Sequence, residues 1–226
     1  MNYRRIDNRV GELKPVHAWI YYCLAFSSDF KTDISNIKQD SLAKKAGCSV
    51  ECIKDAIKDF EQHRMIEKNT ATLTGEKGNF SRNSYILNNG ENYRFMSDKL
   101  FTEDISIELK GFLIIYWSLS LACENYLLLN ANQCAEYISL SKTPIYNYIK
   151  LAIAAGYVQK DSKNKKKTIF VREDIFIPAR KSAYRYALEL YPAMLTDEDI
   201  TNKQIFNTKE EYNKYVNSLY DTYRTT

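Results

Sequence analysis

The sequence predicts a mainly α-helical fold with small β-hairpins, of the α+β class, and three observations support this prediction. Residues 37–68 (the first copy) align without a gap onto residues 129–160 (the second copy), so the chain contains a repeat. Apolar residues recur at helical spacing in both copies. The 226-residue chain has only seven glycines and four prolines to form turns. A period of roughly 90 residues is too long for a solenoid repeat and suits two copies of a small domain.

The repeat divides the chain into three expected parts. We expect one domain over residues 1–92 and a second over residues 93–175. Residues 176–226 have no counterpart in the repeat, and their pattern predicts a helical C-terminal extension. A Glu-Leu-Lys triplet opens the apolar stretch before each copy, at residues 12–14 and 108–110.

The first half of the chain predicts three helices. Residues 16–26 (VHAWIYYCLAF) form an apolar helix, and residues 27–36 form a polar loop. A second helix is expected over residues 37–46, ended by Gly47 as a C-terminal cap. Ser49 then supplies the N-cap of the third helix.

The third helix of the first copy carries one apolar stripe, and a hairpin follows it. The stripe consists of Ile53, Ala56, Ile57 and Phe60. Residues 65–67 and 84–87 are expected to form two strands, with a turn at residues 75–78 between them.

The second half repeats this order. Its first two helices are expected over residues 107–123 and 131–138. Ser141 is expected to cap the third helix, Pro144 suits its first turn, and Gly156 closes it. The apolar stripe of this helix consists of Ile145, Tyr148, Ile149, Ala152 and Ile153.

A helix, a helix-turn-helix and a two-stranded wing, in this order, make up the winged-helix arrangement. The first copy resembles helix-turn-helix domains of phage and plasmid replication proteins in residues 41–49 (SLAKKAGCS) and 78–87 (GNFSRNSYIL). The second copy is similar to the same group in residues 109–113 (LKGFL) and 154–158 (AAGYV). The resemblance covers roughly residues 13–172 and implies two tandem winged-helix domains, as in replication initiators.

In the winged-helix fold the third helix enters the major groove of DNA and reads base edges with its outward face. In the second copy this face suits DNA, because Asn can pair with adenine, and Lys can contact guanine or a phosphate. The face consists of Lys142, Thr143, Tyr146, Asn147 and Lys150. In the first copy Lys54 and Lys58 share the face with Glu51 and Asp55. Either a carboxylate there accepts a hydrogen bond from cytosine, or this helix binds protein.

The expected wings differ in the same direction. The second wing has strands at residues 157–160 and 168–172 around a lysine-rich turn, which suits salt-sensitive contact with the DNA backbone or minor groove. The turn contributes Lys163, Lys165, Lys166 and Lys167. A solvated hairpin without a ligand is the other interpretation. In the first wing the positive charges of Lys77 and Arg82 are partly neutralised by nearby acidic residues. Contact with DNA and a solvated hairpin without a ligand are therefore equally supported for this wing.

The sequence does not predict an enzyme. The only histidines, His17 and His63, lack a metal partner at coordinating spacing, and no glycine pattern of a nucleotide-binding loop is present. We therefore expect no catalytic residue, no metal and no cofactor. No apolar stretch is long enough to cross a membrane, and the five cysteines form no paired motif. These features favour the reducing cytoplasm of a bacterial host cell.

The leading functional hypothesis is sequence-specific binding of double-stranded DNA in phage or plasmid replication initiation. The protein would bind an origin and recruit other replication proteins. The alternatives are a transcription regulator, or a phage protein-interaction or virion-associated module that uses winged helices as scaffold. A tyrosine-rich stripe at residues 212–223 would pack either on the body of the protein or across a homodimer.

Overall fold

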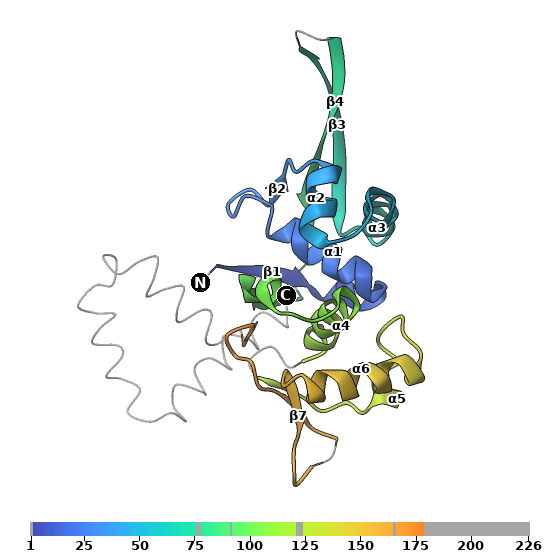
Figure 1. Cartoon of the computed structure of the whole chain (residues 1–226), viewed down its shortest axis with the longest axis vertical. Coiled ribbons are helices and arrows are strands. Elements are labelled where there is room, and N and C mark those ends of the chain that lie inside the picture. Colours follow the sequence, from blue (N-terminus) through green and yellow to red (C-terminus); the bar gives the residue numbers. More distant parts are fainter. Residues whose placement is uncertain (1, 76–77, 91, 121–123, 165, 179–226) are drawn as a thin grey trace, which may run out of the picture. The chain divides into compact units, whose positions relative to one another are not determined.

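The computed structural model describes residues 2–75, 78–90, 92–120, 124–164 and 166–178 (Figure 1). Residues 1–179 form one compact unit. Within the described ranges the fold combines α-helices with three small antiparallel sheets, which confirms the α+β class at this level. Of the expected C-terminal extension, only residues 176–178 belong to the described part of the chain.

The same order of elements occurs in the two halves of this unit. The first half comprises β1 (Tyr3–Asp7), η1 (Asn8–Glu12), α1 (Pro15–Ala25), β2 (Ile34–Ser35), α2 (Gln39–Ala46), α3 (Val50–Gln62), β3 (Ile66–Gly75) and β4 (Gly78–Leu87). The second half comprises β5 (Tyr93–Ser97), η2 (Asp98–Thr102), α4 (Ile107–Ser118), β6 (Tyr126–Leu127), α5 (Ala131–Cys134), α6 (Lys142–Ala154), β7 (Val158–Lys160) and β8 (Thr168–Phe170). A last strand, β9 (Phe176–Ile177), follows.

Each half has its own three-stranded sheet, and a third sheet joins the halves. The strand orders are β2-β4-β3, β6-β8-β7 and β1-β5-β9. β1 and β5 were not expected from the sequence, although both begin with Tyr-Arg (YRRID and YRFMS). Their short polar-rich stretches show no clean alternation, so only their pairing with each other identifies them as strands. The predicted domain boundary at residues 92/93 lies between β4 and β5.

The β3–β4 hairpin is much longer than the sequence predicted. Both strands have ten residues, paired from Ile66 with Leu87 to Gly75 with Gly78, and Figure 1 shows them as a long ribbon. The prediction stopped early because residues 69–74 (NTATLT) are mostly polar and offer only Ala71 and Leu73 toward an apolar face. β2 pairs with β4 only at Tyr85 and Ile86, close to the body.

One hydrophobic core runs through both halves. α1 and α4 lie at its centre, and nearly every residue of these helices is buried. The two helices approach so closely that a methyl group added at Gly111 would lie 1.7 Å from the Pro15 carbonyl oxygen. The predicted apolar stripe of α3 is buried throughout, which confirms the orientation of that helix.

Several predicted caps are confirmed. Gly47 ends α2 in the left-handed region with φ of 69°, and Gly156 follows α6 with φ of 76°. Ser49 caps α3 by accepting a hydrogen bond of 3.2 Å from the Cys52 amide. Ser141 occupies the N-cap position of α6, but its side chain makes no capping hydrogen bond.

Other predictions about the second half were wrong. α4 ends at Ser118, before residue 123, and α5 is a single turn where a helix to residue 138 was expected. After Cys134 the α-helical hydrogen-bond pattern is not continued. The Tyr137 amide donates to the Cys134 carbonyl, which lies three residues earlier instead of four. Ile153 was expected in the apolar stripe of α6, but it is 40% exposed. The second Glu-Leu-Lys triplet lies inside α4, whereas the first precedes α1, so the triplets are not equivalent.

Candidate nucleic-acid interface

The outward face of α6 is set by the residues that anchor the helix to the core. Ile145, Ile149 and Ala152 are buried and hold one side of α6 against the body. Pro144 lies in the first turn, where the backbone N–H has no acceptor within the helix, so the proline breaks no intrahelical hydrogen bond. The opposite side of the helix is therefore turned to solvent.

All five residues predicted for the outward face of α6 are exposed. They are Lys142, Thr143, Tyr146, Asn147 and Lys150. The Lys150 ammonium lies 4.6 Å from the centroid of the Tyr146 ring, a cation–π contact one turn apart. No Asp or Glu occurs in α6, so this face presents cations, hydroxyl groups and an amide without a neighbouring carboxylate on the same helix.

The turn between β7 and β8 is built by two side chains that accept backbone hydrogen bonds. Asp161 Oδ1 accepts from the amides of Lys163 (2.7 Å) and Asn164 (2.9 Å). Asn164 Oδ1 accepts from the Lys166 amide at 3.1 Å. These bonds fix the backbone of the turn. The side chains of Lys163 and Lys166 remain exposed.

The other lysines of this hairpin have partners within the protein. The Lys167 ammonium lies 3.9 Å from Asp161 and 4.2 Å from the centroid of the Tyr126 ring. The Lys160 ammonium donates to Thr168 Oγ1 at 2.6 Å, and burial lowers the pKa of Lys160. The predicted site residue Lys165 lies outside the described residues. The lysine cluster therefore divides into exposed cations and cations that stabilise the hairpin.

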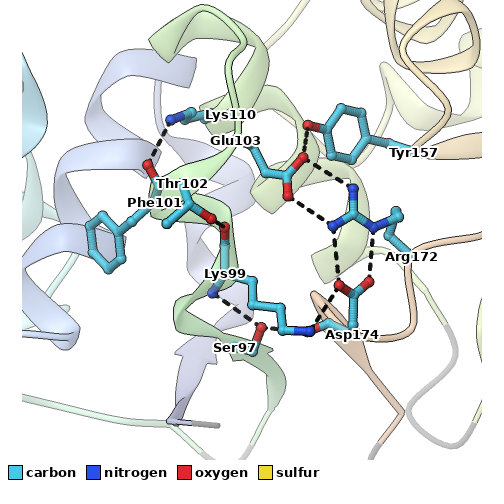
Figure 2. Close-up of polar contacts among 9 residues, drawn as sticks. All are labelled: Ser97, Lys99, Phe101, Thr102, Glu103, Lys110, Tyr157, Arg172 and Asp174. Carbon is cyan, nitrogen blue, oxygen red and sulfur yellow. Dashed lines mark hydrogen bonds and ion pairs between the residues drawn. The ribbon is translucent and has the colours of Figure 1, made fainter.

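Arg172, which follows β8, is held by two carboxylates (Figure 2). Its guanidinium donates to Asp174 at 2.9 and 3.1 Å and to Glu103 at 2.8 and 3.0 Å. Tyr157 donates a further hydrogen bond of 2.6 Å to Glu103, and the Lys99 ammonium lies 3.2 Å from Asp174. Hydrogen bonds from Arg172 lower the pKa of Glu103 and lower that of Asp174 to about 2. This network joins the segment before α4 to the end of the hairpin.

The equivalent face of α3 is partly neutralised. Glu51, Lys54, Asp55 and Lys58 are all exposed, as the sequence predicted. The Lys54 ammonium pairs with Glu51 at 3.1 Å, one turn away along the helix. On the β3–β4 hairpin Arg82 is exposed. The predicted site residue Lys77 lies outside the described residues.

Charge counts show the same difference between the segments that carry α3 and α6. The segment from β2 to β4 contains nine Lys or Arg residues and seven Asp or Glu residues. The segment from β6 to β8 contains seven lysines and only two acidic residues. The segment around α6 therefore carries the higher positive charge toward a polyanion.

Both histidines join secondary-structure elements through carboxylates. His17 Nδ1 lies 2.8 Å from Asp59, which links α1 to α3, and His63 Nδ1 lies 2.6 Å from Glu12. In the part of the chain that the structure describes, no group of three or more His, Cys, Asp or Glu residues could hold a metal ion.

The structure adds a residue to this region that sequence reasoning missed. Tyr137 is 63% exposed directly after α5, at the turn that leads into α6. The prediction placed it within a longer helix, where a tyrosine is more often buried. Because α5 ends at Cys134, Tyr137 lies in the connection to α6 instead.

Comparisons with protein-family models, with curated proteins and with solved structures found no match to this chain. None of the helices in the described ranges has the length and apolar character that crossing a bilayer requires.

Proposed function

We propose that this protein is a tandem winged-helix protein that binds double-stranded DNA in a sequence-specific manner, mainly through α6 and the β7–β8 hairpin. The observation that carries the proposal is the outward face of α6, which has two lysines, an amide and two hydroxyl groups and no carboxylate. A helix of this kind fits the major groove, where such side chains distinguish base pairs.

Individual roles follow from the chemistry of the side chains. Asn147 lies in the middle of the face, where its amide can donate to and accept from an adenine edge. Lys150 and Lys142 lie at the two ends of the face, where ammonium groups reach phosphates or guanine. The contact between Tyr146 and Lys150 restricts the lysine rotamers, which reduces the entropy lost on binding.

The hairpin supplies affinity that does not depend on sequence. Lys163 and Lys166 extend from a turn whose backbone is fixed, so they reach the DNA backbone with little ordering cost. Lys167 and Arg172 are occupied by carboxylates and are assigned to the hairpin structure.

The resemblance to phage and plasmid replication proteins supports a role in replication initiation, in which the protein binds an origin and recruits other replication proteins. A transcription regulator would present the same interface. Footprinting in the native genome separates these roles, because an initiator protects the origin and a regulator protects a promoter.

The half-acidic face of α3 suits DNA less well than the face of α6. Glu51 holds Lys54 in an ion pair, and Asp55 adds a further carboxylate that would oppose a phosphate backbone. A protein-interaction role of α3 is the alternative to a weaker DNA contact by this helix. If α3 binds protein instead of DNA, substitutions on α3 leave DNA binding unchanged.

The test is a salt titration of duplex binding. We expect Lys163→Ala with Lys166→Ala to weaken binding and to lower the slope of log K against log salt by about 2, because each lost phosphate contact removes roughly 0.9. The matched control is Lys14→Ala with Lys31→Ala, which removes two exposed lysines elsewhere in the chain. Equal slopes for the two double variants would remove the hairpin from the interface.

Sequence readout is tested separately with Asn147→Ala. We expect a loss of discrimination of about 1–3 kcal/mol at one base pair, with the salt slope unchanged. A uniform loss over all sequences would assign Asn147 to the backbone, and wild-type protein that binds no duplex at low salt would overturn the proposed function.

A further inference from the structure

The pairing of β1 with β5 is symmetric. Tyr3 in β1 corresponds to Tyr93 in β5, and Arg4 to Arg94, so Asp7 corresponds to Ser97. In the antiparallel register Tyr3 pairs with Ser97 and Asp7 with Tyr93. The first residue of β1 thus pairs with the last residue of β5, and the last residue of β1 pairs with the first residue of β5. This is the register of two identical strands related by a two-fold axis.

Hydrogen bonds at both ends of this strand pair repeat the symmetry. The Asn8 amide donates to the Asn92 carbonyl at 3.0 Å, and the Asp98 amide donates to the Asn2 carbonyl at 2.8 Å. Asp98 is the counterpart of Asn8, and Asn92 is the counterpart of Asn2. The same bond is therefore made twice, once in each direction between the halves.

Contacts farther from the strands follow the same rule. Phe101 of η2 packs against Phe26 with ring centroids 5.6 Å apart, and the Lys45 ammonium lies 4.9 Å from its ring. Its counterpart in the first half is Gly11, and a methyl group there would lie 3.8 Å from Ser118 Oγ and 3.7 Å from the Tyr137 carbonyl oxygen.

The partners in these two contacts are themselves counterparts. Counted from the first residue of each helix, Pro15 of α1 and Ile107 of α4, Phe26 and Ser118 occupy the same position. Lys45 and Tyr137 occupy matching positions of the aligned copies. The two-fold relation therefore extends from the central strands to the helix-turn-helix elements.

We infer that the DNA target consists of two half-sites in inverted orientation within one duplex, one facing α6 and a different one facing α3. The inference rests on the proposed function, because it assumes that DNA is the ligand. Two reading helices related by a two-fold axis match the two-fold symmetry of a duplex, whereas helices related by translation would match direct repeats. Since α3 and α6 present different side chains, the two half-sites have different sequences.

The charges of the α3 and α6 faces predict which half-site contributes more affinity. The α6 face has no carboxylate, whereas Glu51 and Asp55 limit the contacts of α3 to fewer bases and phosphates. The half-site at α6 therefore contributes most of the affinity. The half-site at α3 adds a smaller increment that depends on its orientation.

The experiment uses the full chain and a random duplex pool, from which bound DNA is selected and sequenced. Synthetic duplexes then present the enriched α6 half-site alone, or with the second enriched element inverted, or with it in direct orientation. We expect the inverted arrangement to bind about tenfold tighter than the other two, the range of one well-read base pair.

A variant of α3 provides the control. Lys54→Ala with Lys58→Ala should abolish the advantage of the inverted arrangement and leave binding to the isolated α6 half-site unchanged. A direct repeat, or a single half-site that binds as tightly as the pair, would overturn the two-fold inference while duplex binding stands. A pool without any enriched sequence, and no duplex binding at low salt, would overturn the proposed function itself.

Discussion

Arg172 lies between two carboxylates, and its guanidinium donates hydrogen bonds to both. Glu103 precedes α4 and Asp174 follows β8, so the arginine connects the two ends of the segment from α4 to β8 (Figure 2). Bidentate guanidinium–carboxylate geometry is stronger than an ordinary surface ion pair. The positive charge of Arg172 is therefore paired inside the protein.

Replacement of Arg172 should affect stability and leave the salt dependence of the proposed DNA binding unchanged. We expect Arg172→Met to lower the free energy of unfolding at pH 7 by about 1–2 kcal/mol, because two partly buried carboxylates lose their main partner. Urea denaturation measures the loss, and a salt titration checks the second part. A reduced salt slope would show that Arg172 contacts phosphate after all.

The same network gives a pH dependence with a defined sign. The pKa of Asp174 is lowered to about 2 and that of Glu103 is also lowered, mainly by hydrogen bonds from Arg172. The stabilisation is complete above the pKa of the unfolded carboxyls, near 4. It is lost as the pH falls toward 2. The difference in unfolding free energy between wild type and Arg172→Met should shrink over this window, and a constant difference down to pH 2 would contradict the assignment.

Lysines of the same turn differ in whether their ammonium groups are available to a ligand. Lys163 and Lys167 lie in the same turn, yet the first is exposed and the second is held by Asp161 and the Tyr126 ring. A sequence shows the number of lysines in a turn. The hydrogen bonds of Asp161 and Asn164 decide which of them point outward.

At the scale of elements, α3 and α6 have equivalent positions but different N-terminal caps. Ser49 accepts a hydrogen bond from the Cys52 amide, whereas the Ser141 side chain makes none. Pro144, at the position that corresponds to Cys52, has no amide hydrogen to donate. The two serines therefore look alike in the aligned copies and differ in their contribution.

We expect Ser49→Ala to lower the free energy of unfolding by about 1 kcal/mol and Ser141→Ala to change it by no more than a few tenths. Thermal or urea denaturation of the two variants measures the difference, and each serves as the control for the other. Equal losses would mean that Ser141 caps α6 in solution.

The β3–β4 hairpin shows where periodicity stops predicting strands. Its outer part consists of paired residues such as Thr70 and Asn83, whose side chains lie 2.9 Å apart and face solvent. Alternation identifies a strand when it is long enough to build one apolar face, and residues 69–74 supply only Ala71 and Leu73 for such a face. The inner part, with Tyr85 and Leu87 buried, was the part that the sequence predicted.

At the scale of the whole described unit, the two halves share one core. α1 and α4 cross at Pro15 and Gly111, where a Cβ atom would overlap the backbone. Glycine is required at this position by close approach and not by its dihedral angles. The halves therefore depend on each other for stability.

Gly111→Ala tests this dependence. We expect the free energy of unfolding to fall by more than about 3 kcal/mol, because the neighbouring atoms belong to backbone and cannot move independently. Gly47→Ala is the control: it has open space but a φ of 69°, so it should cost about 1 kcal/mol. A smaller loss for Gly111→Ala than for Gly47→Ala would show that the two helices do not approach this closely.

The sequence by itself determined the local features of this protein. Helical spacing identified the buried stripe of α3, Gly47 and Ser49 gave correct caps, and the outward faces of α3 and α6 could be deduced from the buried ones. These features depend on residues close together in the chain, and their physical causes are periodicity and cap chemistry.

Only the tertiary structure decided how the two halves join and which cations are exposed. The pairing of β1 with β5 brings together residues about 90 positions apart, and neither strand has a local signal that predicts it. Arg172 is held by Glu103, which lies 69 positions earlier in the sequence. Contacts of this kind depend on the position of the backbone in space, which local residue patterns do not encode.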